Sequence, residues 1–193
     1  MPRTKNFDPA EVLEKAKNLF WEKGYYATSM QDLVDTLGIN RASMYDTYGG
    51  KDQLFARALE SYQQAETKEV SAILYYYTNV REGLYIMFEY MLNQALKEGF
   101  SHSCFHVNTV VELSNSSEDV KAKLLAAKEM YLKMYRTYLE YGKSKSQLAA
   151  HKNVEAIAQA LYAFQCGLLA SSKLNPSKEN LMKSVSAFLN LLD

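Results

Sequence analysis

Three side chains that could do acid–base or nucleophilic chemistry lie close together in the sequence: the Cys104 thiol, the His106 imidazole and the Glu112 carboxyl group. A Cys–His pair can generate a reactive thiolate, and a His–Glu pair can transfer a proton. On a helix, side chains share a face at spacings of three or four residues, whereas these spacings are two and six. The sequence contains no Ser–His–Asp order, phosphate-binding loop or metal-ligand spacing. We therefore expect no enzyme and no cofactor, and turnover of a small substrate would contradict this.

The Cys104 thiol has two further interpretations. It lies near His102 and His106 and close to an expected helix N-terminus, where a thiolate is stabilised and can react with electrophiles or oxidants. Alternatively it is an inert, buried thiol, which is the simpler interpretation. The second cysteine, Cys166, has neither Cys-x-x-Cys spacing nor a nearby ligand set, so the sequence indicates no zinc site and no disulfide.

Composition limits the class of protein. Of the 193 residues, 48% are hydrophobic and 23% are charged, and three prolines and eight glycines are few for a turn-rich β fold. No apolar stretch reaches the ~18 residues that span a bilayer, and residues 1–7 lack the apolar centre of a secretory signal. We therefore expect a cytoplasmic protein with no membrane partner.

The charge balance gives no support for a nucleic-acid partner. The net charge is zero, whereas DNA-binding proteins are often basic. Residues 1–60 contain eight Lys or Arg and nine Asp or Glu. Any affinity for phosphate must therefore come from where the charges lie rather than from their sum.

The first fifty residues nevertheless predict three capped helices. Each predicted helix has a capping residue before it and a glycine after it. The caps are Asp8, then Thr28 or Ser29, then Asn40, and the glycines are Gly24, Gly38 and Gly49. Two short helices joined by a glycine-containing turn, with a first helix packed across them, form a helix-turn-helix.

The remainder of the chain predicts longer helices and no strand. One begins at Lys51 and runs to Tyr62. The others cover 66–77, 80–97, 104–114, 118–142, 153–173 and 177–192. The expected fold is all-α, with a helix-turn-helix domain over residues 1–50 and a second helical domain over residues 51–193, to which the family resemblance described next assigns ligand binding and dimerisation.

The segment from Thr28 to Phe55 closely resembles the signature of the TetR/AcrR family of transcriptional regulators. The shared features are the Gly38 turn, the Ser-x-Tyr-x-x-Tyr pattern of residues 43–48 and the Lys-x-x-Leu-Phe pattern of residues 51–55. The resemblance covers residues 9–60. It implies a homodimer that binds double-stranded operator DNA, acts as a repressor and is released by a small-molecule inducer.

The resemblance also implies roles for individual residues at the DNA. Asn40, Arg41, Ala42 and Ser43 open the recognition helix, whose first side chains reach base edges in the major groove. Phosphate contacts are expected from a second group, which lies at helix starts or on the flank of the recognition helix. This group consists of Thr28, Tyr45, Tyr48 and Lys51.

Two positions depart from the family pattern. The family often has aromatic and His residues where this chain has Asp46 and Thr47. An acid beside DNA lowers affinity unless it points away or accepts from a cytosine amine. One alternative is therefore an interaction module that has lost DNA binding, and another is a plain helical hairpin in which Tyr45 and Tyr48 are half-buried.

The middle of the chain is rich in aromatic residues, with a few polar groups among them. Such a mixture describes a small-molecule pocket, and equally an ordinary core. Residues 104–108 also resemble a Cys-x-x-x-Asn stretch found in one branch of the family. The candidate inducer-binding residues are Tyr85, Phe88, Met91, Cys104, His106, Asn108, Tyr131 and Tyr135.

The last two predicted helices are candidates for the dimer interface. The helix over 153–173 is apolar nearly all round, and the last helix carries one apolar stripe. Two such helices from each subunit would form a four-helix interface, and the alternative is a buried core helix within one chain. The candidate interface residues are Leu161, Phe164, Leu168, Leu181, Val185 and Phe188.

Overall fold

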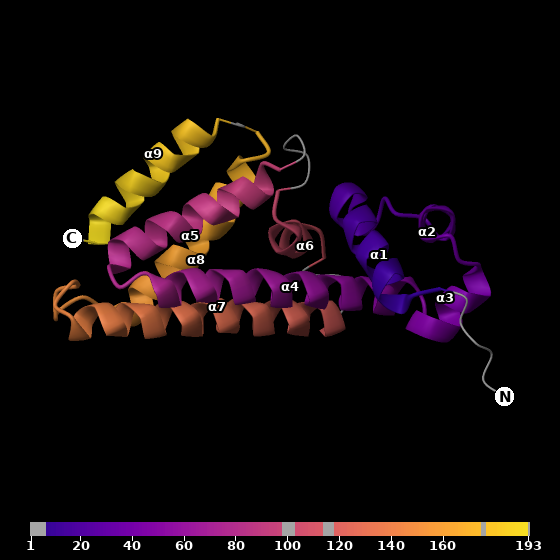
Figure 1. Ribbon diagram of the computed structural model, residues 1–193, viewed down its shortest axis with the longest axis horizontal. Coiled ribbons are helices and arrows are strands. Elements are labelled where there is room, and N and C mark those ends of the chain that lie inside the picture. Colours follow the sequence, from indigo (N-terminus) through magenta and orange to yellow (C-terminus); the bar gives the residue numbers. More distant parts are fainter. Residues whose placement is uncertain (1–6, 98–102, 114–117, 175–176, 193) are drawn as a thin grey trace.

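The computed structural model describes residues 7–97, 103–113, 118–174 and 177–192 and shows an elongated arrangement of helices (Figure 1). The described residues form helices and no strand, as the sequence predicts. The helices are α1 (Pro9–Lys23), α2 (Met30–Leu37), α3 (Arg41–Tyr48), α4 (Lys51–Tyr76), α5 (Val80–Ala95), α6 (Phe105–Leu113), α7 (Glu118–Ser144), α8 (Val154–Ser171) and α9 (Lys178–Leu189), followed by a 3₁₀ turn (Asn190–Leu192).

Local capping determines where the first three helices begin and end. The Asp8 carboxylate accepts from the backbone N–H of Ala10 at 2.8 Å, and Asn40 Oδ1 accepts from the backbone N–H of Ser43 at 2.8 Å. Between α2 and α3 the chain turns at Gly38, whose φ of +66° disfavours a side chain. These starts and stops agree with the sequence prediction.

Helix α4 is one continuous helix of 26 residues, where the sequence analysis expected separate helices ending at Tyr62 and starting at residue 66. Residues 63–65 contain no glycine or proline, so nothing interrupts the backbone hydrogen bonds there. The first half of α4 buries Leu54 and Ala58 among the N-terminal helices, and the second half buries Val70 and Leu74 among the C-terminal helices.

Two hydrophobic cores result, and α6 contributes to both. Phe105 and Leu113 of α6 pack into the core formed with α1–α4, and Val107 packs into the core formed with α4, α5 and α7–α9. Figure 1 shows α6 between α1 and the C-terminal helices. Tyr62 contacts both cores, and its ring lies 5.7 Å from that of Phe105. The N-terminal helices are therefore attached to the rest of the chain through α4 and α6.

Candidate DNA-binding surface and effector site

Helix α3 presents one face to solvent and buries the other. Arg41, Ala42, Tyr45 and Asp46 are exposed, and Ser43 is half-buried. Met44 is fully buried against α1, α2 and α4, which fixes the rotation of α3. Because side chains at i, i+1, i+4 and i+5 share one side of a helix, the exposed residues form a continuous surface. The acid at Asp46 lies on the same exposed helix as Arg41.

Tyr48 does not belong to this surface, which corrects the predicted phosphate contact. Its side chain is 3% exposed, and its hydroxyl donates to the Pro9 carbonyl oxygen at 2.8 Å. The hydroxyl therefore uses its one proton to join α3 to the start of α1. Tyr45, in contrast, is 47% exposed.

Thr28 is also turned inward, so its predicted hydroxyl contact with phosphate is wrong. Its side chain is fully buried, and its hydroxyl donates to the Gly24 carbonyl oxygen at 2.6 Å. The N-cap of α2 is Ser29, whose Oγ accepts from the backbone N–H of Asp32 at 3.0 Å. In return, Asp32 accepts from the backbone N–H of Ser29 at 2.8 Å, which completes a capping box.

Asn40 is the N-cap of α3 and Lys51 is the first residue of α4, and both side chains already make contacts within the chain. The Asn40 side-chain oxygen caps the helix, and its amide group is exposed. The Lys51 ammonium group lies 4.2 Å from the centre of the Tyr25 ring. Partial burial lowers the pKa of this amine, and the nearby carboxylates of Asp52 and Glu112 act in the opposite direction.

Helix α6 is joined to the N-terminal helices by polar contacts that sequence reasoning did not find. The Glu112 carboxylate accepts from the backbone N–H groups of Tyr25 at 3.1 Å and Tyr26 at 2.8 Å. At the other end of α6, the Trp21 indole donates to the Ser103 carbonyl oxygen at 3.0 Å. These partners are more than eighty residues apart, so no local pattern could have paired them.

A buried polar cluster lies where α4, α6, α7 and α8 meet. We define it as Tyr62, Gln63, Glu66, Cys104, His106, Tyr131, Tyr135, Tyr162 and Gln165. His106 lies at its centre, with Nδ1 3.0 Å from Gln63 Nε2 and Nε2 3.1 Å from the Tyr162 hydroxyl. Burial lowers the pKa of His106 to about 4, so the imidazole is neutral near pH 7.

Two polar atoms of the cluster lack a hydrogen-bond partner among the described residues: Glu66 Oε2 and the Tyr131 hydroxyl. Glu66 is buried, and burial raises the pKa of its carboxyl group to about 7. Unpaired polar atoms in an interior cost free energy and commonly mark a functional site. Two such atoms therefore remain inside the buried polar cluster.

Four of the eight candidate inducer residues meet in the buried polar cluster: Cys104, His106, Tyr131 and Tyr135. Phe88 and Met91 are buried in the same core, with the Phe88 ring packed on Phe164 rather than in the cluster. Tyr85 lies beside α9, and Asn108 faces the crevice between α6 and α1. The structure thus separates these two residues from the other candidates.

Cys104 is buried, and the Tyr62 hydroxyl lies 3.5 Å from its sulfur. Burial raises the pKa of the Cys104 thiol well above its usual range, and the nearby Glu66 carboxyl group acts in the same direction. His106 is neutral and gives no cationic partner, and His102 lies outside the described residues. This environment favours the inert thiol over the reactive one.

The candidate interface residues lie inside their own chain. Leu161, Leu168, Leu181 and Val185 are buried in the C-terminal core. The partly buried rings of Phe164 and Phe188 stack at 4.1 Å and so join α8 to α9. The prediction that these four aliphatic side chains form an intermolecular surface is corrected, because α5, α8 and α9 already cover them.

A different set of residues faces outward on α8. Its members are small and recur every three or four residues: Ala156, Ala160, Ala163, Gly167 and Ala170. A division of the sequence into apolar and polar residues places these alanines and the buried leucines in the same class. The sequence pattern therefore predicts the helix but not which of its faces is exposed.

Two further observations concern metal and membrane. Within the described residues, no group of three or more His, Cys, Asp or Glu side chains is placed to hold a metal ion. Across the same ranges, no helix is both long and apolar enough to cross a membrane.

Comparisons with known proteins match both parts of the chain. Residues 12–58 match the family model for bacterial regulatory proteins of the tetR family, and residues 82–188 match that for the tetracyclin repressor-like C-terminal domain. The chain is 30% identical, over the whole length of both, to the uncharacterized HTH-type transcriptional regulator YezE of Bacillus subtilis. It is 27% identical to the HTH-type transcriptional repressor ComR of Escherichia coli, over 98% of this chain and 90% of the relative.

Solved structures share the fold. A cysteine mutant of the TetR family transcriptional regulator CifR, complexed with 26-bp double-strand operator DNA, superposes with a TM-score of 0.88 at 25% identity, covering 97% of this chain and 98% of the other. The reduced form of Escherichia coli NemR superposes with a TM-score of 0.84 at 21% identity, covering 95% of each chain.

Proposed function

The chain belongs to the tetR family of bacterial regulatory proteins, and on that basis we propose that it is a repressor that binds operator DNA as a homodimer and is released by a small-molecule inducer. Family membership makes the chain a DNA-binding transcriptional regulator and not an enzyme. Repression, dimerisation and release are the proposed parts. We place its action in the cytoplasm, with α1–α3 (within residues 1–50) as the DNA-binding domain and residues 51–193 as the ligand-binding and dimerisation domain.

The observation that carries the proposal is the outward face of α3. Arg41 and Ala42 lie exposed at the capped start of the helix, where a recognition helix contacts base edges, and Tyr45 lies one turn further on. In the proposed complex, Arg41 donates to base acceptors, and Tyr45 and Lys51 contact phosphates on either side. Asn40 and Ser43 shape the start of the helix and lie beside these contacts.

The homodimer supplies the second recognition helix. Two copies of α3 must lie about 34–36 Å apart to enter successive major grooves on one side of the duplex. The exposed small residues of α8 allow the helices of two chains to approach closely and form a two-fold interface. Phe164 and Phe188 support that interface from within each chain.

Release requires an inducer that binds one arrangement of the dimer better than the other. The buried polar cluster lies beside α6, and α6 holds the turn after α1 through Glu112. A displacement of α6 would therefore change the position of the N-terminal helices relative to the rest of the chain. We propose this route for the coupling between the inducer and the DNA.

The test is DNA binding by the purified full chain to the sequence upstream of its own gene, titrated at two salt concentrations. Arg41→Ala is expected to weaken specific binding about 5-fold to 150-fold, since a bidentate base contact contributes about 1–3 kcal/mol. Lys183→Ala, which removes an exposed charge on α9, is the matched control and should bind as the unmodified chain does. Absence of binding at low salt by a folded dimer would refute the proposed function.

A further inference from the structure

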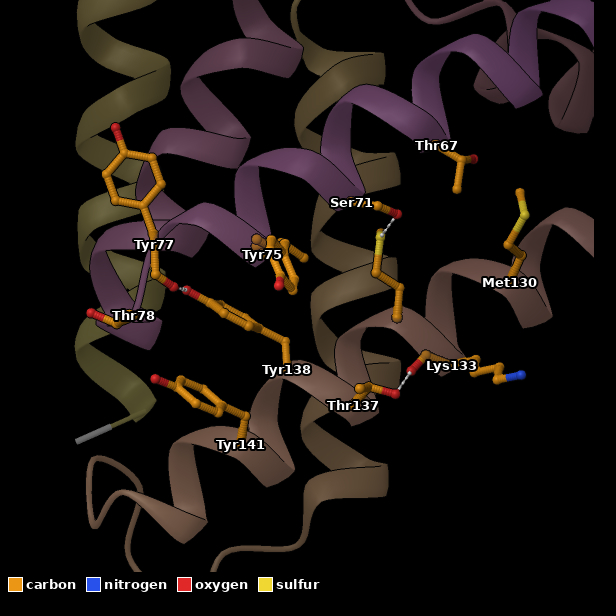
Figure 2. Close-up of a pocket in the computed structure, with 12 residues that line it drawn as sticks. Thr67, Ser71, Tyr75, Tyr77, Thr78, Met130, Lys133, Thr137, Tyr138 and Tyr141 are labelled. Atoms are coloured by element: carbon orange, nitrogen blue, oxygen red, sulfur yellow. Dashed lines mark hydrogen bonds between the residues drawn. The ribbon is translucent and has the colours of Figure 1, made fainter.

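A groove runs between the second half of α4 and α7, apart from the buried polar cluster (Figure 2). It encloses about 520 Å³ and is closed at one end by the link between α4 and α5. Its lining consists of Thr67, Ser71, Leu74, Tyr75, Tyr77, Thr78, Met130, Lys133, Met134, Thr137, Tyr138 and Tyr141. Helices α8 and α9 do not contribute to the lining.

The walls of the groove are aromatic and thioether groups held in place. The Tyr138 hydroxyl lies 2.8 Å from the Tyr77 carbonyl oxygen, to which it donates, and Tyr138 stacks on Tyr141 with a ring separation of 6.4 Å. The Ser71 hydroxyl lies 3.3 Å from the Met134 sulfur. These contacts join α4 to α7 along the floor of the groove, so its shape exists before any ligand arrives.

Tyr75 makes the rim of the groove unusual. Its side chain is 93% exposed although it follows the buried Leu74 directly. Met130, on the opposite wall, is also exposed. Apolar surface left in water on both walls favours a partner that covers it.

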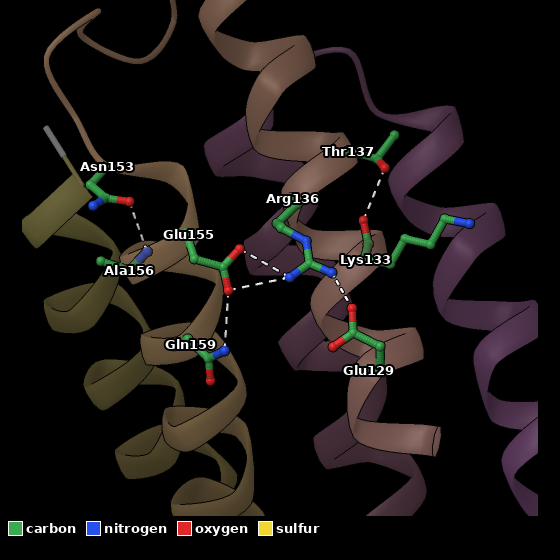
Figure 3. Close-up of polar contacts among 8 residues, drawn as sticks. All are labelled: Glu129, Lys133, Arg136, Thr137, Asn153, Glu155, Ala156 and Gln159. Carbon is green, nitrogen blue, oxygen red and sulfur yellow. Dashed lines mark hydrogen bonds and ion pairs between the residues drawn. The ribbon is translucent and has the colours of Figure 1, made fainter. Parts of the chain in front are cut away.

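The charge at the groove comes from a single lysine. Among the described residues of the lining, Lys133 carries the only charge. One turn along α7, Arg136 binds both Glu129 and Glu155, and Glu155 also accepts from Gln159 (Figure 3). Figure 3 shows the Lys133 ammonium group pointing away from this network, and no described carboxylate lies within ion-pair distance of it. Lys133 therefore leaves a positive charge beside an aromatic groove.

We propose that this groove binds an aromatic molecule that carries a negative charge, such as a carboxylate or a sulfonate. The rings lie against the tyrosine and methionine side chains, and the anion lies at Lys133. A volume of about 520 Å³ is in the range of small-molecule sites, so we assign the groove to a small molecule and not to a second copy of the chain. That such a molecule acts as the inducer rests on the proposed function, whereas its binding does not.

The test uses two fluorescent probes with the full chain in the absence of DNA. The probes are 8-anilinonaphthalene-1-sulfonate, which is anionic, and N-phenyl-1-naphthylamine, which has similar rings and no charge. Both should bind saturably with one molecule per chain. Lys133→Gln should weaken binding of the anionic probe about three- to fivefold, as expected for an exposed charge pair, and leave the neutral probe within twofold.

Two further variants locate the probes. Ser71→Trp and Thr137→Phe each place a large side chain in the groove and should abolish binding of both probes, with folding verified by circular dichroism. Lys121→Gln, which removes a charge on α7 about 18 Å along the helix from Lys133, should change nothing.

The proposal is overturned if both groove-filling variants fold and still bind the probes, or if Lys133→Gln behaves as Lys121→Gln does. Operator binding is measured separately on the unmodified chain. Saturable probe binding without any operator binding by this chain would leave the groove standing and refute the proposed function. Operator binding without probe binding would refute the groove and leave the proposed function standing.

Discussion

The Glu112 carboxylate on α6 holds the backbone of Tyr26, with a second hydrogen bond to the preceding residue, in the turn between α1 and α2. An ideal Cβ at Gly24 would lie 2.9 Å from Glu112 Oε2, so the glycine leaves room for this carboxylate. Together with the hydrogen bond from Trp21 to Ser103, this contact links α6 directly to the helix-turn-helix. In the proposed mechanism, this contact passes a movement of α6 to the helix-turn-helix.

We expect Glu112→Gln to lower the free energy of unfolding by about 1–2 kcal/mol. The amide oxygen can replace only part of a carboxylate that accepts two backbone N–H groups, and its NH₂ group meets donors. The measurement is urea unfolding followed by circular dichroism. Glu118→Gln, at a highly exposed position on α7, is the control and should be neutral. Equal stability of the two variants would contradict the role given to Glu112.

The two tyrosines of α3 should behave in opposite ways. Tyr45→Phe removes an exposed hydroxyl and should weaken operator binding about threefold to tenfold with unchanged stability. Tyr48→Phe removes the hydrogen bond to Pro9 and should lower stability by about 1 kcal/mol. Fluorescence anisotropy with labelled operator DNA and thermal unfolding separate the two effects. A larger loss of DNA affinity in Tyr48→Phe than in Tyr45→Phe would contradict this assignment.

Glu66→Gln should remove a pH dependence of stability. Burial raises the pKa of the Glu66 carboxyl from the usual 4.5 to about 7, so the folded chain holds this proton more tightly than the unfolded chain. Its contribution is therefore most favourable below about pH 4.5 and is lost as pH rises through 7, by up to about 3 kcal/mol. In urea unfolding, the free energy of unfolding of the variant should rise relative to that of the unmodified chain between pH 5 and pH 8.

The pH dependence that His106 gives to stability has the opposite sign to that of Glu66. The free energy of unfolding of each variant is therefore compared with that of the unmodified chain at the same pH. Its pKa is lowered to about 4, and its contribution to stability is complete above the unfolded value of 6.5 and lost as pH falls towards 4. In a plot of the free energy of unfolding against pH, His106→Gln should therefore reduce the slope on the acid side. Glu66→Gln should reduce the slope near neutral pH. Parallel curves for Glu66→Gln and the unmodified chain would show that Glu66 does not titrate as described.

The thiol of Cys104 should react slowly in the folded chain. Its burial and raised pKa leave little thiolate at pH 8. Titration with 5,5′-dithiobis(2-nitrobenzoate) of the Cys166→Ala variant should show a rate at least a hundredfold below that in urea. A rate near that of a free thiol would restore the hypothesis that Cys104 senses electrophiles or oxidants.

Local signals in the sequence were sufficient for the helix-turn-helix. The caps at Asp8 and Asn40 and the turn at Gly38 depend on neighbouring residues, so their positions could be predicted. The capping pattern before α2 fits both Thr28 and Ser29. In the structure the Thr28 side chain is buried, and Ser29 is the N-cap.

Sequence patterns could not settle what depends on distant contacts. His106 meets Gln63 and Tyr162 from two other helices, and neither partner has a signal in the sequence around it. On α8, hydrophobicity alone could not show that Leu161 faces inward and Ala163 outward. The leucines proposed for dimerisation therefore lie inside their own chain, and which residues form an interface stays a proposal.

The unbroken course of α4 has a mechanical consequence. At 1.5 Å per residue, its 26 residues make a rod about 39 Å long, with the groove at one end and α3 beside the other. A tilt of about 5° at the groove end would displace the far end by about 3 Å, close to the ~3.4 Å rise of one base step. A helix interrupted near residue 64 would absorb that rotation at the break. An uninterrupted helix would instead carry the rotation to its far end, so an angular change too small to disturb the packing around a ligand would shift α3 by about one base step.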